Sequence, residues 1–169
     1  VWDHVGVGEY EDALLELLRR VEASEETDDV QNFLSWPGGA RTEGDSSDGW
    51  KHNPVGPFPD FKAQPLPDYA LFDTQRITDL KDGWFSVMTS RGCPYRCTYC
   101  LNHRIVDTYK ADLNRKVADL GFFRFRDPEF VVKELKHVLE THERVETFLF
   151  DDDLFTQNAE HAIAVCDAM

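Results

Sequence analysis

The sequence predicts an α/β fold in which short strands alternate with amphipathic helices. Residues 84–90 are rich in strand-favouring side chains, and the apolar segment 145–150 lies between two helical patterns. Strands joined by right-handed helical crossovers run parallel, so the loops after residues 90 and 150 should emerge at the same edge of one sheet. We therefore expect the polar residues of these two loops to face each other.

The N-terminal segment predicts one strand and one helix. Residues 1–9 form a short apolar segment that runs into a glycine turn, and a helix follows from about Tyr10 to Ala23. Five apolar side chains share one stripe of that helix: Ala13, Leu14, Leu17, Leu18 and Val21. One strand and one helix cannot bury a strand on both faces, so we interpret residues 1–23 as the end of a larger α/β domain.

Residues 24–83 are expected to connect two domains, because their composition shifts to proline, glycine, aspartate and serine. Turn clusters are predicted at 36–39 and 44–50. The segments 32–36 and 50–53 are candidate strands of one hairpin.

The C-terminal part predicts two helices. Asp127, Pro128 and Glu129 favour a helix start, and the helix should run to about Thr141 or Glu143. Its expected buried stripe consists of Val131, Leu135, Val138 and Leu139. A second helix is expected from about Asn158, with Ala159, Ala162, Ile163 and Cys166 in register, and Cys166 is expected to be a buried core thiol.

Composition limits the classes of partner. The 169 residues include 18 basic and 32 acidic side chains, a net charge of -14, which disfavours nucleic acid and anionic lipid as partners. No apolar run approaches the roughly 18 residues of a membrane span. We expect a cytoplasmic, reducing location.

Three of the four cysteines, Cys93, Cys97 and Cys100, lie within eight residues. Gly92 and Pro94 favour a loop that wraps back on itself, so the spacing predicts a metal-binding loop. A four-iron, four-sulfur cluster takes about one cysteine per iron, and three cysteines would leave one iron open to a small molecule. Two alternatives stay open: a closed Cys3His zinc site that adds His103, and disulfide bonding, which cannot pair three clustered cysteines completely.

The loop from Ser90 to Cys100 resembles the signature of the radical S-adenosylmethionine (SAM) superfamily, with an aromatic residue, Tyr99, before the last cysteine. The resemblance implies a [4Fe–4S] cluster on Cys93, Cys97 and Cys100, with SAM chelating the open iron. It also implies reductive cleavage of SAM to methionine and a 5′-deoxyadenosyl radical, and a place for Tyr99 near the adenine.

Other segments resemble the subgroup of this superfamily that carries a cobalamin-binding domain. The segment 65–73 is similar to its interdomain linker, and the turn at Gly8 and Glu9 is weakly similar to the last unit of its cobalamin domain. Its second core strand is matched at five positions: Phe150, Asp152, Asp153, Phe155 and Thr156. The resemblance implies cobalamin as a further cofactor. The Asp-x-His-x-x-Gly motif of some cobalamin domains is not found, because Asp3 and His4 are adjacent.

In that subgroup the acidic loop occupies the place of the motif that contacts the SAM amino group. We therefore expect Asp152 and Asp153 to bind SAM, because a carboxylate there would hold the ammonium. Two alternatives are an acidic first turn that stabilises the next helix and a divalent metal site.

The fold implied is the start of a radical SAM partial (β/α)6 barrel, preceded by the last βα unit of a Rossmann-like cobalamin-binding domain and truncated at both ends. Residues 1–23 would be the cobalamin-domain remnant, 24–83 the connector and 84–169 the radical SAM core. The implied function is a radical SAM enzyme that carries out cobalamin-dependent methyl transfer or related radical chemistry on a small molecule, with an electron donor such as flavodoxin or ferredoxin. Two alternative functions are a transfer RNA methylthiotransferase, whose loop is similar, and a zinc-stabilised binding module.

Overall fold

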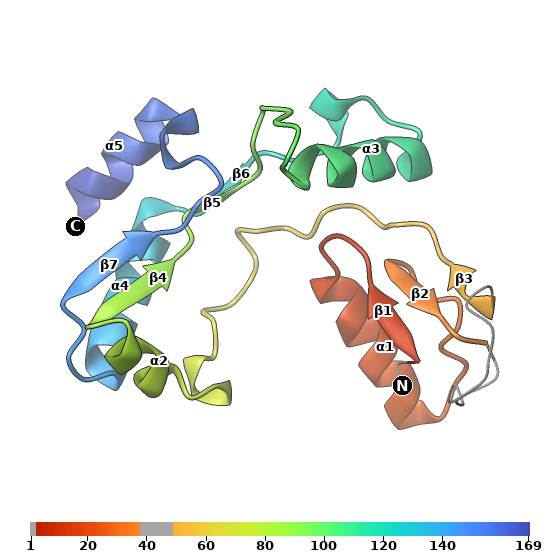
Figure 1. Ribbon diagram of the computed structural model, residues 1–169, viewed down its shortest axis with the longest axis horizontal. Coiled ribbons are helices and arrows are strands. Elements are labelled where there is room, and N and C mark those ends of the chain that lie inside the picture. Colours follow the sequence, from red (N-terminus) through yellow and green to blue (C-terminus); the bar gives the residue numbers. More distant parts are fainter. Residues whose placement is uncertain (1–2, 38–48) are drawn as a thin grey trace. The chain divides into compact units, whose positions relative to one another are not determined.

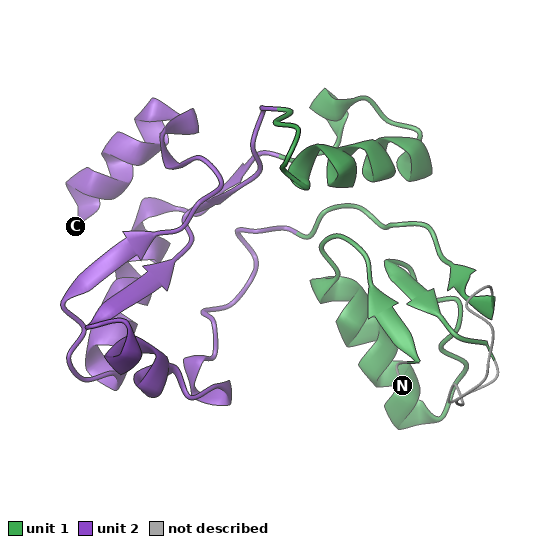
Figure 2. Ribbon diagram, in the orientation of Figure 1, with its two compact units in different colours: residues 1–59, 96–122 green, residues 60–95, 123–169 purple. Residues whose placement is uncertain are grey.

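The computed structural model describes residues 3–37 and 49–169, and the chain divides into two compact units. Unit 1 comprises residues 1–59 and 96–122, and unit 2 comprises 60–95 and 123–169 (Figure 2). Of residues 24–83, 24–59 lie in unit 1 and 60–83 in unit 2, and the predicted domain divisions at 23 and 83 stay predictions. The assignment of 1–23 to a cobalamin-binding domain stays a prediction.

Unit 1 contains a three-stranded antiparallel sheet in the order β1-β2-β3 (Figure 1). Its elements are β1 (His4–Gly6), α1 (Glu11–Ala23), β2 (Phe33–Ser35), β3 (Lys51–His52) and α3 (Asn102–Leu113). The expected hairpin is confirmed by the pairing of Leu34 with His52. The turn clusters expected at 36–39 and 44–50 lie mostly outside the described residues, as do residues 1 and 2 of the first predicted strand.

The expected apolar stripe of α1 is only partly buried. Leu17 is 7% exposed and packs with Val30 and Phe33, whereas three other members of the stripe are 38–58% exposed: Leu14, Leu18 and Val21. A helical period therefore identified the apolar face correctly, but the described elements of unit 1 cover only part of it.

Unit 2 is built on a parallel pair of strands, β4 (Trp84–Val87) and β7 (Thr147–Phe150). Figure 1 shows α4 (Pro128–Thr141) behind this pair, with α5 (Ala159–Ala168) following β7. The unit also contains α2 (Thr74–Leu80) and the short antiparallel pair β5 (Ser90–Arg91) and β6 (Arg124–Phe125). The predicted parallel arrangement of β4 and β7 is confirmed.

The core of unit 2 joins the strand pair to both of the long helices. It consists of Phe85, Val87, Val131, Leu135, Val138 and Val165. Burial of each such side chain contributes about 1.5–3 kcal/mol relative to exposure. Helix α4 begins and ends where the sequence predicts, with Asp127 as its N-cap residue and Pro128 in its first turn.

Two burial predictions for unit 2 are wrong, because Leu139 is 55% exposed and Cys166 is exposed. Ile163, which was placed in the same helical register as Cys166, is 60% exposed. Glu134 and His161 are buried instead, on α4 and α5 respectively. The core packs against one side of each predicted stripe, so residues at the margin of the stripe remain in solvent.

No helix among residues 3–37 and 49–169 is long and apolar enough to cross a lipid bilayer.

Candidate functional site

The acidic loop begins where β7 ends, beside the end of β4. Val87 pairs with Phe150, and the Asp151 amide donates to the Val87 carbonyl at 2.9 Å, so the parallel ladder extends one residue beyond the strands. The chain then leaves both strands at their carboxyl ends. The expectation that the two loops share one edge of the sheet is confirmed within unit 2.

The carboxylate of Asp152 is bound to the two residues that precede the cysteine loop. Its Oδ1 accepts hydrogen bonds from the Thr89 amide at 3.0 Å, the Thr89 hydroxyl at 3.1 Å and the Ser90 hydroxyl at 2.6 Å, and from the Ser90 amide. Thr89 is 0% exposed and Ser90 is 3% exposed. One carboxylate oxygen therefore serves four donors that have little access to water.

The second oxygen of Asp152, Oδ2, is buried and has no hydrogen-bond partner among the described residues. His161 of α5 lies nearby, with its Nε2 3.4 Å from the Thr89 hydroxyl. Burial lowers the pKa of His161, and the negative charge of Asp152 opposes that shift. The balance favours the neutral imidazole more than in a solvated histidine.

Asp153 contacts the cysteine loop at Gly92, two residues after Ser90. Its Oδ2 accepts a hydrogen bond from the Gly92 amide at 3.2 Å, and its side chain is exposed. Gly92 has φ +98°, which side chains with a Cβ rarely adopt, so a glycine is needed at the residue before Cys93. The acidic loop thus contacts the chain at three positions close in sequence: Thr89, Ser90 and Gly92.

The cysteine loop crosses the boundary between the two units, which falls between Tyr95 and Arg96. Cys93 belongs to unit 2, whereas Cys97 and Cys100 belong to unit 1. All three thiols are partly buried, and none of them forms a disulfide among the described residues. The prediction that the three thiols share one cluster stays a prediction.

Two cysteines lie in a tight turn that leads into α3. The Cys100 amide donates to the Cys97 carbonyl at 3.0 Å, and the Asn102 amide donates to the Cys100 Sγ at 3.5 Å. The Cys100 sulfur therefore lies beside the N-terminus of α3. Arg96 pairs with Asp107 of α3 at 2.8 Å, which ties the start of this turn to the helix.

Among the described residues, no group of three His, Cys, Asp or Glu side chains is arranged to hold a metal ion. His103, the fourth ligand of the zinc alternative, has a buried Nδ1 without a hydrogen-bond partner in that part of the chain. The thiols nevertheless fit an iron–sulfur cluster in their chemistry, because they are free and one of them already accepts an amide hydrogen bond, as cluster thiolates do.

Tyr99 is 91% exposed, so its ring is accessible to a ligand. No role in binding or positioning was predicted for the side chains of Thr89, Ser90 or His161. The adjacent hydroxyl residues at the end of a strand were a usable signal, since buried Ser and Thr side chains need polar partners. His161 carried no comparable signal, because a histidine on a helix is ambiguous without its neighbours.

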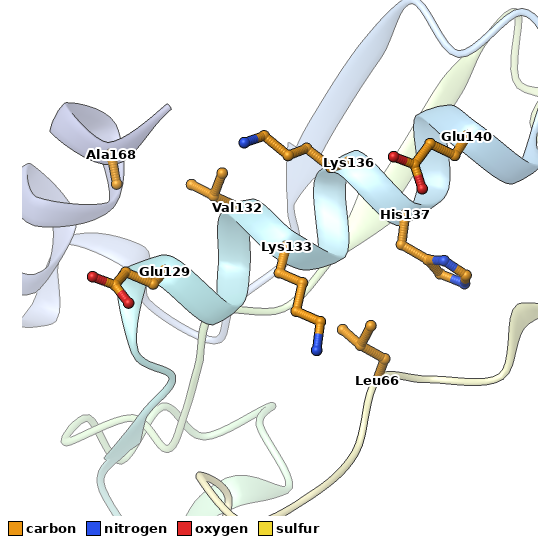
Figure 3. Close-up of a pocket in the computed structure, with 8 residues that line it drawn as sticks. All are labelled: Leu66, Glu129, Val132, Lys133, Lys136, His137, Glu140 and Ala168. Carbon is orange, nitrogen blue, oxygen red and sulfur yellow. The ribbon is translucent and has the colours of Figure 1, made fainter.

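One cavity of unit 2 lies away from these loops. It has a volume of about 530 Å³ and lies on the outer face of α4, between that helix, Leu66 and Ala168 (Figure 3). Its polar lining residues are Glu129, Lys133, Lys136, His137 and Glu140. None of the lining residues belongs to the cysteine loop or the acidic loop, so the cavity is separate from the candidate site.

Solved structures of similar fold were found by comparison. The radical SAM methyltransferase TsrM from Kitasatospora setae, solved with tryptophan substrate and the SAM analogue aza-SAM, has a TM-score of 0.60 and 17% identity, over 98% of this chain. The cobalamin-dependent SAM radical enzyme OxsB, solved with aqua-cobalamin and SAM, has a TM-score of 0.61 and 23% identity, over 94% of this chain. The chain shares the fold of the matched part of these two enzymes.

The likeness covers only part of each of those enzymes. The chain spans 28% of the TsrM chain and 20% of the OxsB chain. A second TsrM structure, with cobalamin and a [4Fe–4S] cluster bound, also has a TM-score of 0.60.

No protein-family model matches the chain, and no curated protein sequence matches it. The mixed α/β class is confirmed, whereas the partial (β/α)6 barrel stays a prediction.

Proposed function

We propose that this chain is part of a cobalamin-dependent radical SAM enzyme. The observation that carries the proposal is the junction of two motifs in one fold: the acidic loop after β7 contacts the chain directly before Cys93, through Asp152 and Asp153. The fold shared with TsrM and OxsB supports the same conclusion.

Cys93, Cys97 and Cys100 would hold a [4Fe–4S] cluster through their thiolates. With the cluster bound, the chemistry supplied at this loop is the one-electron cleavage of SAM to methionine and a 5′-deoxyadenosyl radical. The turn between Cys97 and Cys100 and the hydrogen bond from the Asn102 amide to the Cys100 Sγ would help to orient two of the ligands.

Residues beside the thiols would position SAM. The exposed ring of Tyr99 is suited to contact the adenine, because an aromatic face stacks on a base. The acidic loop supplies negative charge for the SAM ammonium, through Asp152 or Asp153, since a charge-assisted hydrogen bond is stronger than a neutral one.

Methyl transfer to a small molecule is the reaction we propose for the enzyme, by likeness to TsrM, which is described as a methyltransferase. A flavodoxin or ferredoxin would supply the electron. The net charge of -14 disfavours a nucleic acid substrate and so favours this proposal over a transfer RNA methylthiotransferase. Cobalamin binding would further separate the two, because only the proposed enzyme requires it.

The test is metal analysis of the anaerobically purified and reconstituted chain. We expect about four iron and four sulfide per chain and an electron paramagnetic resonance spectrum that changes when SAM is added. Single alanine replacements of Cys93, Cys97 and Cys100 should each remove most of the iron. Cys166→Ala is the matched control, because Cys166 is exposed on α5 outside the loop. Stoichiometric zinc without sulfide would overturn the proposal.

A further inference from the structure

We propose that Asp152 is a positioning residue that holds Thr89 and Ser90, where the cysteine loop begins. We further propose that Asp153 is the carboxylate of the acidic loop that binds the SAM amino group. The inference rests on the proposed function for the part that concerns SAM. The part that concerns the loop rests on hydrogen bonds within unit 2.

The Oδ1 atom of Asp152 is fully occupied by hydrogen bonds within unit 2. This oxygen accepts from both amides and both hydroxyls of Thr89 and Ser90. Four donors exceed the two lone pairs of a carboxylate oxygen, so Oδ1 has no capacity left for an ammonium group. The other oxygen, Oδ2, is buried. Neither oxygen of Asp152 is therefore well placed to receive a ligand.

The segment of Thr89 and Ser90 depends on the Asp152 carboxylate for its hydrogen bonds. Thr89 and Ser90 are almost completely buried, so water cannot readily replace the lost acceptor. The opposite side of the segment is already held, because the Arg126 amide donates to the Thr89 carbonyl at 2.8 Å and Ser90 pairs with Phe125 of β6. Asp152 holds the other side of the segment, and it does so at Ser90, three residues before Cys93.

Asp153 differs from Asp152 in its exposure to solvent and in its hydrogen bonds. Its side chain is exposed, and its one hydrogen bond in the described chain is accepted by Oδ2 from the Gly92 amide. An exposed carboxylate with acceptor capacity left can bind an ammonium without the loss of a structural contact. The two adjacent aspartates therefore have different tasks.

Two kinds of replacement separate positioning from direct contact. Asp152→Asn keeps an oxygen acceptor but removes the charge, whereas Asp152→Ala removes both. If Asp152 acts through hydrogen bonds, the asparagine should rescue what the alanine loses. If Asp152 binds the ammonium by its charge, both variants should lose SAM affinity alike while the cluster remains intact.

The loop is measured in the metal-free full chain by hydrogen exchange. We expect Asp152→Ala to speed exchange of the peptide that contains Thr89 and Ser90 by about tenfold or more, and Asp152→Asn to speed it by less than about threefold. Asp153→Asn is the control and should leave this exchange unchanged. Unchanged protection in Asp152→Ala would overturn the positioning role whether or not the chain binds a cluster.

The reconstituted chain gives the second readout. We expect Asp152→Ala to lose cluster iron faster to a chelator, and Asp153→Asn to keep the cluster but bind SAM at least about tenfold more weakly. Equal loss of SAM affinity in Asp152→Asn and Asp152→Ala with an intact cluster would refute the inference. Absence of a cluster in the wild-type chain would refute the proposed function and leave the exchange result to decide the loop.

Global unfolding by Asp152→Ala is detected by the exchange of the β4 and β7 amides. If that protection is lost, Ser90→Ala replaces the test, because it removes one donor to Oδ1 and keeps the carboxylate. It should speed exchange of the same peptide by a few-fold, and no change would again contradict the positioning role.

Discussion

Tyr109 and Glu9 exchange two hydrogen bonds although 100 residues separate them in the chain. The Glu9 amide donates to the Tyr109 hydroxyl at 3.0 Å, and that hydroxyl donates to the Glu9 carbonyl at 3.1 Å. The ring is 0% exposed and stacks on Phe58 at 3.8 Å. A Cβ on Gly8, which has φ +70°, would lie 2.6 Å from the ring, so only glycine allows this approach.

Tyr109→Phe should therefore destabilise unit 1 by about 1–3 kcal/mol, because the Glu9 backbone and the Asn32 side chain lose a buried partner. The stack on Phe58 is retained. The free energy of opening is measured by hydrogen exchange of the α3 amides. Tyr10→Phe is the control, since Tyr10 is 41% exposed, and it should change that free energy by less than about 0.5 kcal/mol. Equal effects of the two replacements would contradict the anchoring role of Tyr109.

The core of unit 2 depends on one side of α4. Leu135→Ala should reduce the free energy of unfolding by about 2–5 kcal/mol, because it leaves a cavity in the cluster formed with Phe85 and Val138. Leu139→Ala makes the same chemical change on the same helix, but Leu139 is 55% exposed, so its effect should stay within about 0.5 kcal/mol. Urea unfolding followed by circular dichroism compares the two. A large loss from Leu139→Ala would show that solvent does not reach that side chain.

The hydroxyl of Tyr69 donates to Glu134 at 2.6 Å, and Glu134 is only 4% exposed. Tyr69→Phe should cost about 1.5–3 kcal/mol near neutral pH, because the buried carboxylate loses a donor. Burial raises the pKa of Glu134 above its usual 4.5, and the Tyr69 hydrogen bond opposes that shift. The folded state therefore binds the proton more tightly, and stability falls as the pH rises from 4.5 through the folded pKa.

The cost of Tyr69→Phe should accordingly shrink in acid, where Glu134 is protonated in both proteins and no longer needs a donor for a charge. Urea titrations at a series of pH values measure this difference. Tyr95→Phe is the control, because Tyr95 is 62% exposed in the same unit. A cost that does not vary with pH would mean that Glu134 is already neutral in the folded chain.

His161 gives the opposite pH dependence. Burial lowers its pKa below the usual 6.5, so the unfolded chain binds the proton more readily than the folded chain. Its contribution to stability is fully present above pH 6.5 and is lost as the pH falls toward the lowered pKa. His161→Gln should flatten the pH profile of unfolding in that window, at fixed ionic strength. An unchanged slope would show that the imidazole is solvated in the folded chain.

The parallel pairing of β4 and β7 and the shared edge of their loops could be predicted from the sequence, because a helical crossover leaves few other arrangements. The start of α4 could be predicted as well, since Asp127 and Pro128 act locally. These features depend on short-range rules, and the structure confirms them.

Burial and long-range partners could not be predicted in the same way. The periodic pattern placed Leu139 and Cys166 on apolar faces, but burial also requires a covering element, which a periodic pattern does not specify. The contact between Tyr109 and Glu9 joins distant segments that carry no common motif. In the candidate site, the sequence identified Asp152 as a polar residue near the cysteine loop, but its hydrogen bonds to Thr89 and Ser90 depend on the register of two strands.

Helix α3 has Cys100 just before its first turn and Tyr109 in its third, and its 12 residues form a rod about 18 Å long. A helix of this length is stiff compared with a loop. Tyr109 holds this helix to the backbone of Glu9, and the helix begins two residues after Cys100. The N-terminal turn therefore helps to fix the position of the segment that carries two of the three clustered cysteines.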